Sequence, residues 1–175
     1  MIKDFVFQLR YIPRALILTG LLICTYHYLK DNKEQWKEKI RSFLKKPWLL
    51  LFLFYTSMML MGTIFARQTT YPLKKIFGSF GFSDDPIWNN EIVENLVLFI
   101  PYIFLYLQAF LPLHPFTSIM KFSAVTTTFI EGCQLLFCLG NFQLADMVHN
   151  MIGGVIGYAL WRMYRGINRY LLQRK

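Results

Sequence analysis

The sequence predicts an all-α fold, a membrane bundle of about five transmembrane helices that forms a single domain over residues 1–175. Of the 175 residues, 55% are apolar and only 17% are charged, which is too hydrophobic for a typical soluble domain. Aromatic residues make up 18% of the chain, which excludes a disordered segment. The apolar residues also form long runs, and about 20 such residues cross a bilayer as a helix, because a helix satisfies its own backbone hydrogen bonds.

Five apolar runs are long enough to be spans, and they cover residues 12–29, 48–66, 95–113, 118–139 and 147–164. The first run is short. Lys3, Arg10 and Arg14 lie before its apolar part, as basic residues do in a signal peptide. However, no small-residue cleavage site follows Ile23. We therefore expect this run to be retained, either as a span or as a helix in the membrane interface, in which case four spans remain.

The charges predict how the bundle is oriented. Lys and Arg number 19 against 10 Asp and Glu, a net charge of +9. No nucleic-acid-binding motif accompanies this charge, and in membrane proteins basic residues collect on the cytoplasmic side. The 30–47 connection, Lys121 and residues 162–175 together hold 13 of the 19. We therefore predict a multi-pass protein of the cell membrane with the 30–47 connection and the C-terminus in the cytoplasm and the 67–94 connection outside.

Both long connections contain aromatic and apolar side chains. In the 30–47 connection these residues recur at helical spacing, so its basic face contacts either anionic headgroups or solvent; they are Trp36, Ile40, Phe43 and Leu44. In the 67–94 connection the aromatic residues are Phe77, Phe80, Phe82 and Trp88. These four are either interface anchors or the lining of a groove that contacts lipid or a drug.

Polar side chains within the spans are the main functional signal, because an ionisable group near the bilayer centre costs at least a few kcal/mol. In the fourth run one helical face carries Thr127, Glu131, Gln134 and Cys138. In the fifth run one stripe carries Asp146, Asn150, Gly153 and Gly157, and Gly154 widens its small-residue surface for helix packing. A short connection joins the two runs, so we expect their polar faces to converge.

Two further elements are expected to contribute to this polar site. Asn95 begins the third run, and Pro101 removes the hydrogen bond to the Val97 carbonyl and favours a kink. Arg67 ends the second run on the same side, and we predict that its guanidinium neutralises Glu131 or Asp146. The binding residues are therefore predicted to be Arg67, Asn95, Glu131, Gln134, Asp146 and Asn150. The alternative is that these polar residues only hold the helices together.

The sequence predicts no metal and no cofactor. Cys24, Cys133 and Cys138 lie within apolar stretches and form neither a disulfide framework nor a zinc-ligand pattern. His149 follows Asp146 by three residues but falls off the polar stripe, so it is either a proton-transfer group or a bystander.

Three motifs in order carry a family resemblance: Glu94-Asn-Leu-Val-Leu-Phe-Ile-Pro101, then Glu131-x-x-Gln134, then Asp146-x-x-x-Asn150-x-x-Gly153-Gly154. Together they resemble the VanZ-like family of small bacterial integral membrane proteins, and the match covers residues 89–158. The resemblance implies a cell-envelope protein. It also implies a link to antibiotic resistance, through tolerance of teicoplanin and related lipoglycopeptides.

The residues themselves lead to two hypotheses about function. In the first, an outward-facing polar pocket engages an amphiphile, either a lipoglycopeptide antibiotic or a lipid-linked cell-wall precursor. In the second, an intramembrane enzyme acts on a lipid headgroup, with Glu131 or Asp146 as the catalytic general acid or base. A transporter is disfavoured because the chain has few spans and no repeated half. Membrane lipids are the expected partners, no nucleic acid is expected, and the sequence carries no signal for an oligomeric state.

Overall fold

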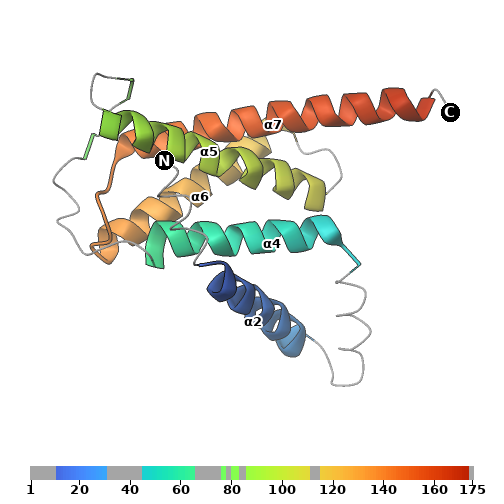
Figure 1. Ribbon diagram of the computed structural model, residues 1–175, viewed down its shortest axis with the longest axis horizontal. Coiled ribbons are helices and arrows are strands. Elements are labelled where there is room, and N and C mark those ends of the chain that lie inside the picture. Colours follow the sequence, from blue (N-terminus) through green and yellow to red (C-terminus); the bar gives the residue numbers. More distant parts are fainter. Residues whose placement is uncertain are drawn as a thin grey trace. The chain divides into compact units, whose positions relative to one another are not determined.

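The computed structural model describes residues 11–30, 45–65, 76–77, 80–82, 86–110 and 115–173. These residues fold almost entirely as helices, which confirms the predicted all-α fold class (Figure 1). The chain divides into two compact units, residues 1–66 and residues 67–175.

The described residues of the first unit form two α-helices and a short π-helix. Helix α2 runs over Ile12–Lys30, α4 over Pro47–Leu60, and the π-helix η1 continues α4 over Met61–Phe65. Pro47 lies in the first turn of α4, where a helix does not need its N–H. The Thr19 hydroxyl donates a hydrogen bond to Ser57 Oγ at 2.8 Å, which joins α2 to α4.

The second unit is a three-helix bundle of α5 (Pro86–Ala109), α6 (Phe116–Leu136) and α7 (Leu144–Gln173). Helices α5 and α7 run in the same direction and form the largest contact, while α6 runs antiparallel to both (Figure 1). Stacked rings join α5 to α6, since Phe122 lies 5.6 Å from the ring of Tyr102 and 4.1 Å from that of Tyr106.

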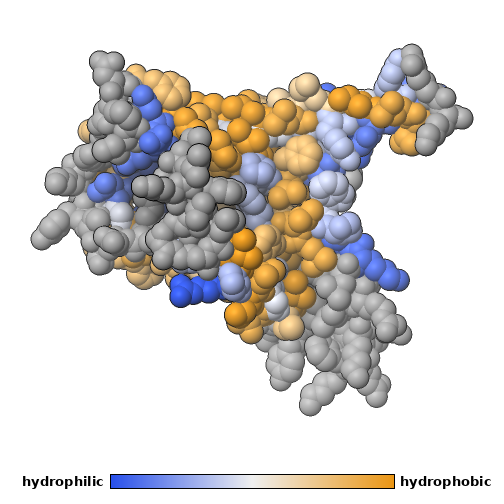
Figure 2. Space-filling view, viewed as in Figure 1, coloured by the Kyte–Doolittle hydropathy of each residue, from blue (hydrophilic) through white to orange (hydrophobic). Residues whose placement is uncertain are grey.

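Among the described residues, two helical stretches are long and apolar enough to cross a membrane, Pro47–Phe65 and Asn89–Ala109. Only 28% and 33% of their apolar windows are buried within the structure, whereas the core helix of a soluble protein would be mostly buried. In the space-filling view, apolar side chains cover much of α5 and α7 (Figure 2). The other three predicted spans are helical but less apolar: α6 and α7 carry buried polar residues, and the apolar stretch Ile12–Leu21 of α2 is short.

The helices extend beyond the predicted spans at two ends. Helix α5 begins at Pro86 rather than residue 95, and α7 continues to Gln173 rather than ending at residue 164. The physical reason is the same in both cases: polar residues end an apolar run without ending a helix. The predicted helix in the 30–47 connection lies mostly outside the described residues, as do Arg67 and much of the 67–94 connection.

Candidate functional site

The polar faces of α6 and α7 lie against each other. Asn150 Nδ2 donates a hydrogen bond to Thr127 Oγ1 at 2.8 Å. One helical turn further along, a Cβ on Gly154 would lie 2.6 Å from Ser123 Oγ, so these two residues also touch. All four are buried. We call this contact, continued in both directions along the two helices, the α6–α7 seam.

The same register brings the two predicted carboxylates to one end of the seam. Glu131 follows Thr127 by four residues, and Asp146 precedes Asn150 by four. The two helices are antiparallel, so four residues forward along α6 correspond to four residues backward along α7. Since Thr127 pairs with Asn150, Glu131 lies opposite Asp146. Asp146 lies in the first turn of α7, where the positive end of the helix dipole favours a carboxylate.

Glu131 is buried, with 2% of its surface exposed. Its Oε2 accepts a hydrogen bond from the backbone N–H of Gln143 at 3.1 Å, immediately before α7 begins. Burying a carboxylate is costly unless hydrogen bonds replace its water, and this bond supplies one. Gln134, one turn along α6, is also buried.

A tight helix end places Gln143 beside Glu131. After α6, the Leu139 N–H bonds the Gln134 carbonyl at 2.8 Å and the Cys138 N–H bonds the Leu135 carbonyl at 3.4 Å. Cys138 has a φ of 54°, the left-handed conformation that ends a helix in this hydrogen-bond pattern. The pattern reverses the chain, so that it returns along α6 as α7.

The start of α7 is capped by backbone from the 67–94 connection. The Leu144 N–H bonds the Ile76 carbonyl at 2.8 Å, and the Ala145 N–H bonds the Phe77 carbonyl at 3.2 Å. The first N–H groups of a helix have no partner within the helix. Residues far away in sequence therefore satisfy two of them and are held at the same end as Glu131.

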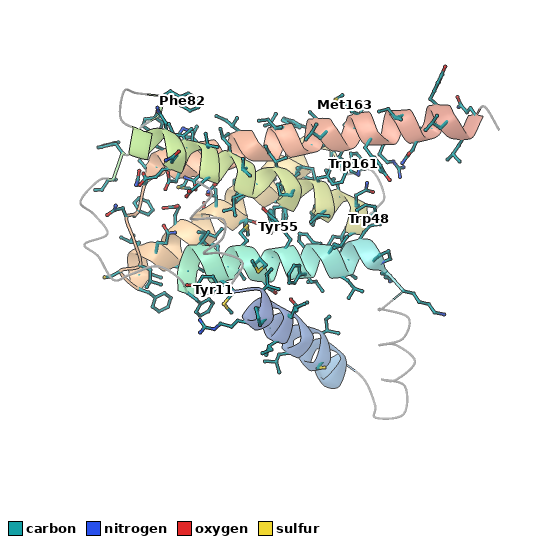
Figure 3. All side chains as sticks on the ribbon, viewed as in Figure 1. Tyr11, Trp48, Tyr55, Phe82, Trp161 and Met163 are labelled. Carbon is teal, nitrogen blue, oxygen red and sulfur yellow. The ribbon has the colours of Figure 1, made fainter. Side chains whose placement is uncertain are left out.

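His149 makes a third contact with this connection. Its Nε2 lies 3.2 Å from the Phe80 carbonyl, and because a carbonyl only accepts, Nε2 is the donor. The backbone at Ile76, Phe77 and Phe80 is thus tied to α7. The side chains of Phe77, Phe80 and Phe82 are 70%, 56% and 69% exposed. Phe82 is labelled beside the start of α5 (Figure 3). We call these three residues the aromatic rim.

The glycine stripe of α7 lies directly on α5. A Cβ on Gly153 would collide with the Leu96 carbonyl, and one on Gly157 with the Ile100 carbonyl. Both glycines are buried, and only residues without a side chain allow such close approach. The contact between Gly153 and Leu96 also fixes the register of α5 and α7, which run in the same direction. Asn89 lies seven residues before Leu96, and Asp146 lies seven residues before Gly153, so Asn89 and Asp146 lie at the same height along the two helices.

The remaining predicted site residues lie apart from the hydrogen bonds of the seam. Asn95 is half-buried on α5, next to the residue that contacts Gly153. Pro101 lies inside α5, which continues as helix to Ala109. Arg67, the predicted partner of the carboxylates, lies outside the described residues.

Three buried polar atoms along the seam have no hydrogen-bond partner among the described residues: Ser123 Oγ, His149 Nδ1 and Asn150 Oδ1. Buried polar atoms of proteins normally bond to protein, water or ligand. Of these atoms, Asn150 Oδ1 is an acceptor, and it lies one turn from the level of the Glu131 and Asp146 carboxylates. This group of acceptors suits a ligand that carries N–H or O–H groups. Within the described parts of the chain, His, Cys, Asp and Glu form no group of three that could hold a metal ion.

Sequence patterns do not identify the backbone contributions to this site. The Gln143 N–H and the Ile76 and Phe77 carbonyls are independent of side-chain type, so the sequence gives no signal for them. The position of Asn89 beside Asp146 could have been predicted by extending the α5 helix back to Pro86, since a proline is favoured at the first helical position.

Comparison with known protein families identifies the family of this chain. The family described as VanZ/LLP1 matches residues 14–165, which is most of the chain and includes every motif quoted above. No curated protein and no solved structure matches the chain.

Proposed function

Because this chain belongs to the VanZ/LLP1 family, we propose that it is a bacterial cell-envelope membrane protein that binds an amphiphile at the carboxylate end of the α6–α7 seam. The amphiphile is a lipoglycopeptide antibiotic or a lipid-linked cell-wall precursor. Both have an apolar tail and a polar head with amide N–H and hydroxyl groups. The predicted orientation puts this end of the seam in the outer half of the bilayer, where both molecules occur.

One observation carries the proposal: exposed aromatic side chains and a buried carboxylate lie at the same end of α7. Phe77 and Phe80 of the aromatic rim are held there by their backbone, through the bonds from Ala145 and His149. Glu131 is held there by the Gln143 N–H. An apolar tail can pack on exposed aromatic rings, while a head with N–H and O–H groups can bond to a carboxylate.

The polar part of the proposed site comprises Glu131, Asp146 and Asn150. Asn150 Nδ2 is already used by Thr127, which orients Oδ1 as a free acceptor within the described structure. Gln134 and Asn95 flank this group, and Arg67 remains the proposed counter-charge. In this arrangement the protein recognises the head by hydrogen bonds and the tail by apolar contact.

The test is lipoglycopeptide binding to cells that carry Glu131→Gln or Asp146→Asn protein. Each substitution keeps the shape and removes the charge, and hydrogen bonds to charged groups contribute about 1.5–3 kcal/mol, so binding should weaken about tenfold or more. Lys121→Gln, a neutralising change at an exposed position of α6, is the matched control. Unchanged binding by both carboxylate variants, with the fold intact, would refute the proposal.

A second function is favoured by the register of the seam. Two carboxylates that face each other can act as a general acid and a general base, so the alternative is an intramembrane enzyme that acts on the headgroup it binds. Purified protein would then convert a lipid-linked precursor, and both carboxylate variants would bind it but fail to turn it over. If the unmodified protein binds the precursor but does not convert it, the enzyme hypothesis is excluded and only the binding function remains.

A further inference from the structure

The C-terminal part of α7 extends beyond the packed part of its unit. Trp161, 1% exposed, is the last buried residue of α7, and of the twelve residues that follow it only Arg165 and Asn168 are half-buried. Helix α7 projects past the end of α5 (Figure 1). Figure 3 shows Trp161 on the side of α7 that faces α5, and Met163 on the opposite side. We call residues 162–173 the C-terminal arm.

Helix α7 as a whole is too long to lie within the bilayer core. Helix α7 has 30 residues and is therefore about 45 Å long, against about 30 Å for the hydrocarbon core. With the predicted span ending at residue 164, most of the arm lies at or beyond the membrane surface.

The arm has two distinct faces. Arg162, Arg165 and Arg169 are three and four residues apart, so they lie on one side of the helix. Ile167 and Leu171, four residues apart, lie on the opposite side and are 57% and 55% exposed. No acidic residue occurs in residues 162–175. A helix with a basic face and an apolar face is typical of segments that bind the membrane interface.

Contacts with the preceding turn orient two of the arginines. The Arg165 guanidinium lies 5.7 Å from the centre of the Trp161 ring, and Arg162 donates a hydrogen bond to the Tyr158 hydroxyl at 3.5 Å. Both side chains therefore point back along the helix, toward residues within the predicted span, and the two arginines lie on either side of residue 164, where that span ends. This is the level of the phosphate groups.

Gly166 gives the arm a point at which it can bend. A Cβ at this position would meet nothing within 4 Å, so packing does not require the glycine. Glycine weakens a helix relative to alanine, and a bend here would turn the apolar face of residues 167–173 toward the surface.

From these features we infer that the C-terminal arm binds an anionic phospholipid surface, with its arginines on the phosphate groups and Ile167 and Leu171 at the edge of the acyl chains. The positive charge of the arm favours an anionic phospholipid surface over other binding partners. A second copy of the arm has no acidic residue, so it offers no partner for the arginine face, whereas phosphate groups do. This inference does not depend on the proposed function of the seam, which lies at the other end of α7.

The experiment uses the full chain in lipid nanodiscs, with its three native cysteines replaced by serine. An environment-sensitive fluorophore is attached at Leu171→Cys, on the apolar face, or at Gln173→Cys, near the arginine face. Discs of phosphatidylcholine are compared with discs that also contain phosphatidylglycerol, each with a lipid-attached quencher. The label at residue 171 should be quenched strongly with phosphatidylglycerol and less at high salt, while the label at residue 173 should be quenched less.

The arginines are then replaced together, as Arg162→Gln, Arg165→Gln and Arg169→Gln. The ratio of membrane-bound to free arm should fall about fivefold for each arginine removed, and the three Arg→Lys changes should largely preserve it. Equal quenching with and without phosphatidylglycerol, or in the glutamine variant, would overturn the inference. Energy transfer between the arms of two copies in one disc would also overturn it, because the arm would then bind a second copy. A label that stays exposed to water until an acidic protein is added would overturn it too, because the partner would then be a protein.

Discussion

The side-chain amide of Asn150 donates a 2.8 Å hydrogen bond to the Thr127 hydroxyl, with both residues fully within the α6–α7 contact. This bond sets the register of the two helices. One turn toward the start of α7, the same register places Glu131 opposite Asp146. The two carboxylates of the site meet only if the helices keep this alignment.

The first prediction concerns the bond itself. In a double-mutant cycle, Asn150→Ala and Thr127→Val should couple by about 0.6 kcal/mol or more, the usual size for interhelical hydrogen bonds in membrane proteins. Thermal and denaturant unfolding in mixed micelles measures this coupling. Asn150→Ala combined with Thr126→Val is the control, because Thr126 bonds the Phe122 carbonyl of its own helix. That pair should show coupling near zero, and equal coupling in both pairs would contradict the assignment.

The second prediction concerns the glycines of α7. Gly153→Ala and Gly157→Ala should each destabilise the protein by about 1–3 kcal/mol, because the added Cβ meets a backbone carbonyl of α5 that cannot move aside. Gly132→Ala in α6 is the matched control, since its Cβ would meet nothing within 4 Å. The control should be neutral or slightly stabilising through helix propensity. Similar unfolding temperatures for all three variants would show that α5 and α7 do not pack in this way.

The third prediction concerns the end of α6. A left-handed conformation costs a residue other than glycine about 1–2 kcal/mol, and Cys138 adopts it. Cys138→Gly should therefore stabilise the protein by about 1 kcal/mol, measured by thermal unfolding. Cys133→Gly, in the interior of α6, should have the opposite sign because glycine weakens a helix. A loss of stability in both variants would argue against the left-handed turn at residue 138.

The fourth prediction concerns the tie between His149 and Phe80. His149→Ala removes one hydrogen bond, which contributes about 1 kcal/mol, so backbone amides at residues 80–82 should exchange with solvent about fivefold faster. Hydrogen exchange followed by mass spectrometry measures this. Val148→Ala, a change at the neighbouring exposed position, should leave the exchange at residues 80–82 as it was. Unchanged exchange in the His149 variant would mean that the rim is held by other contacts.

Much of the fold could be predicted from the sequence, because helices in membrane proteins follow long apolar runs. Each of the five apolar runs matches a helix of the described chain, in the predicted order. The i, i+4 spacing of Asp146 and Asn150 predicts the polar stripe on α7. The helix ends were less predictable. Residues 86–94 are polar enough to look like a loop, yet they continue α5, and α7 continues through the arginine-rich C-terminal arm.

The site was less predictable than the fold, because part of it is backbone. The bond from Gln143 to Glu131 depends on a turn in which cysteine takes a conformation that glycine usually supplies. The capping of α7 by Ile76 and Phe77 joins segments almost 70 residues apart through atoms that every residue has. No side-chain pattern signals either contact.

The most direct test of the central claim, that Glu131 and Asp146 face each other across the α6–α7 seam, is cross-linking in native membranes. Glu131→Cys and Asp146→Cys are combined in a chain whose native cysteines are serine, and a short thiol-specific cross-linker is added. The account predicts efficient cross-linking of this pair and little for Glu131→Cys with Val148→Cys, since Val148 lies off the seam. Efficient cross-linking of the Val148 pair, with none between residues 131 and 146, would contradict it.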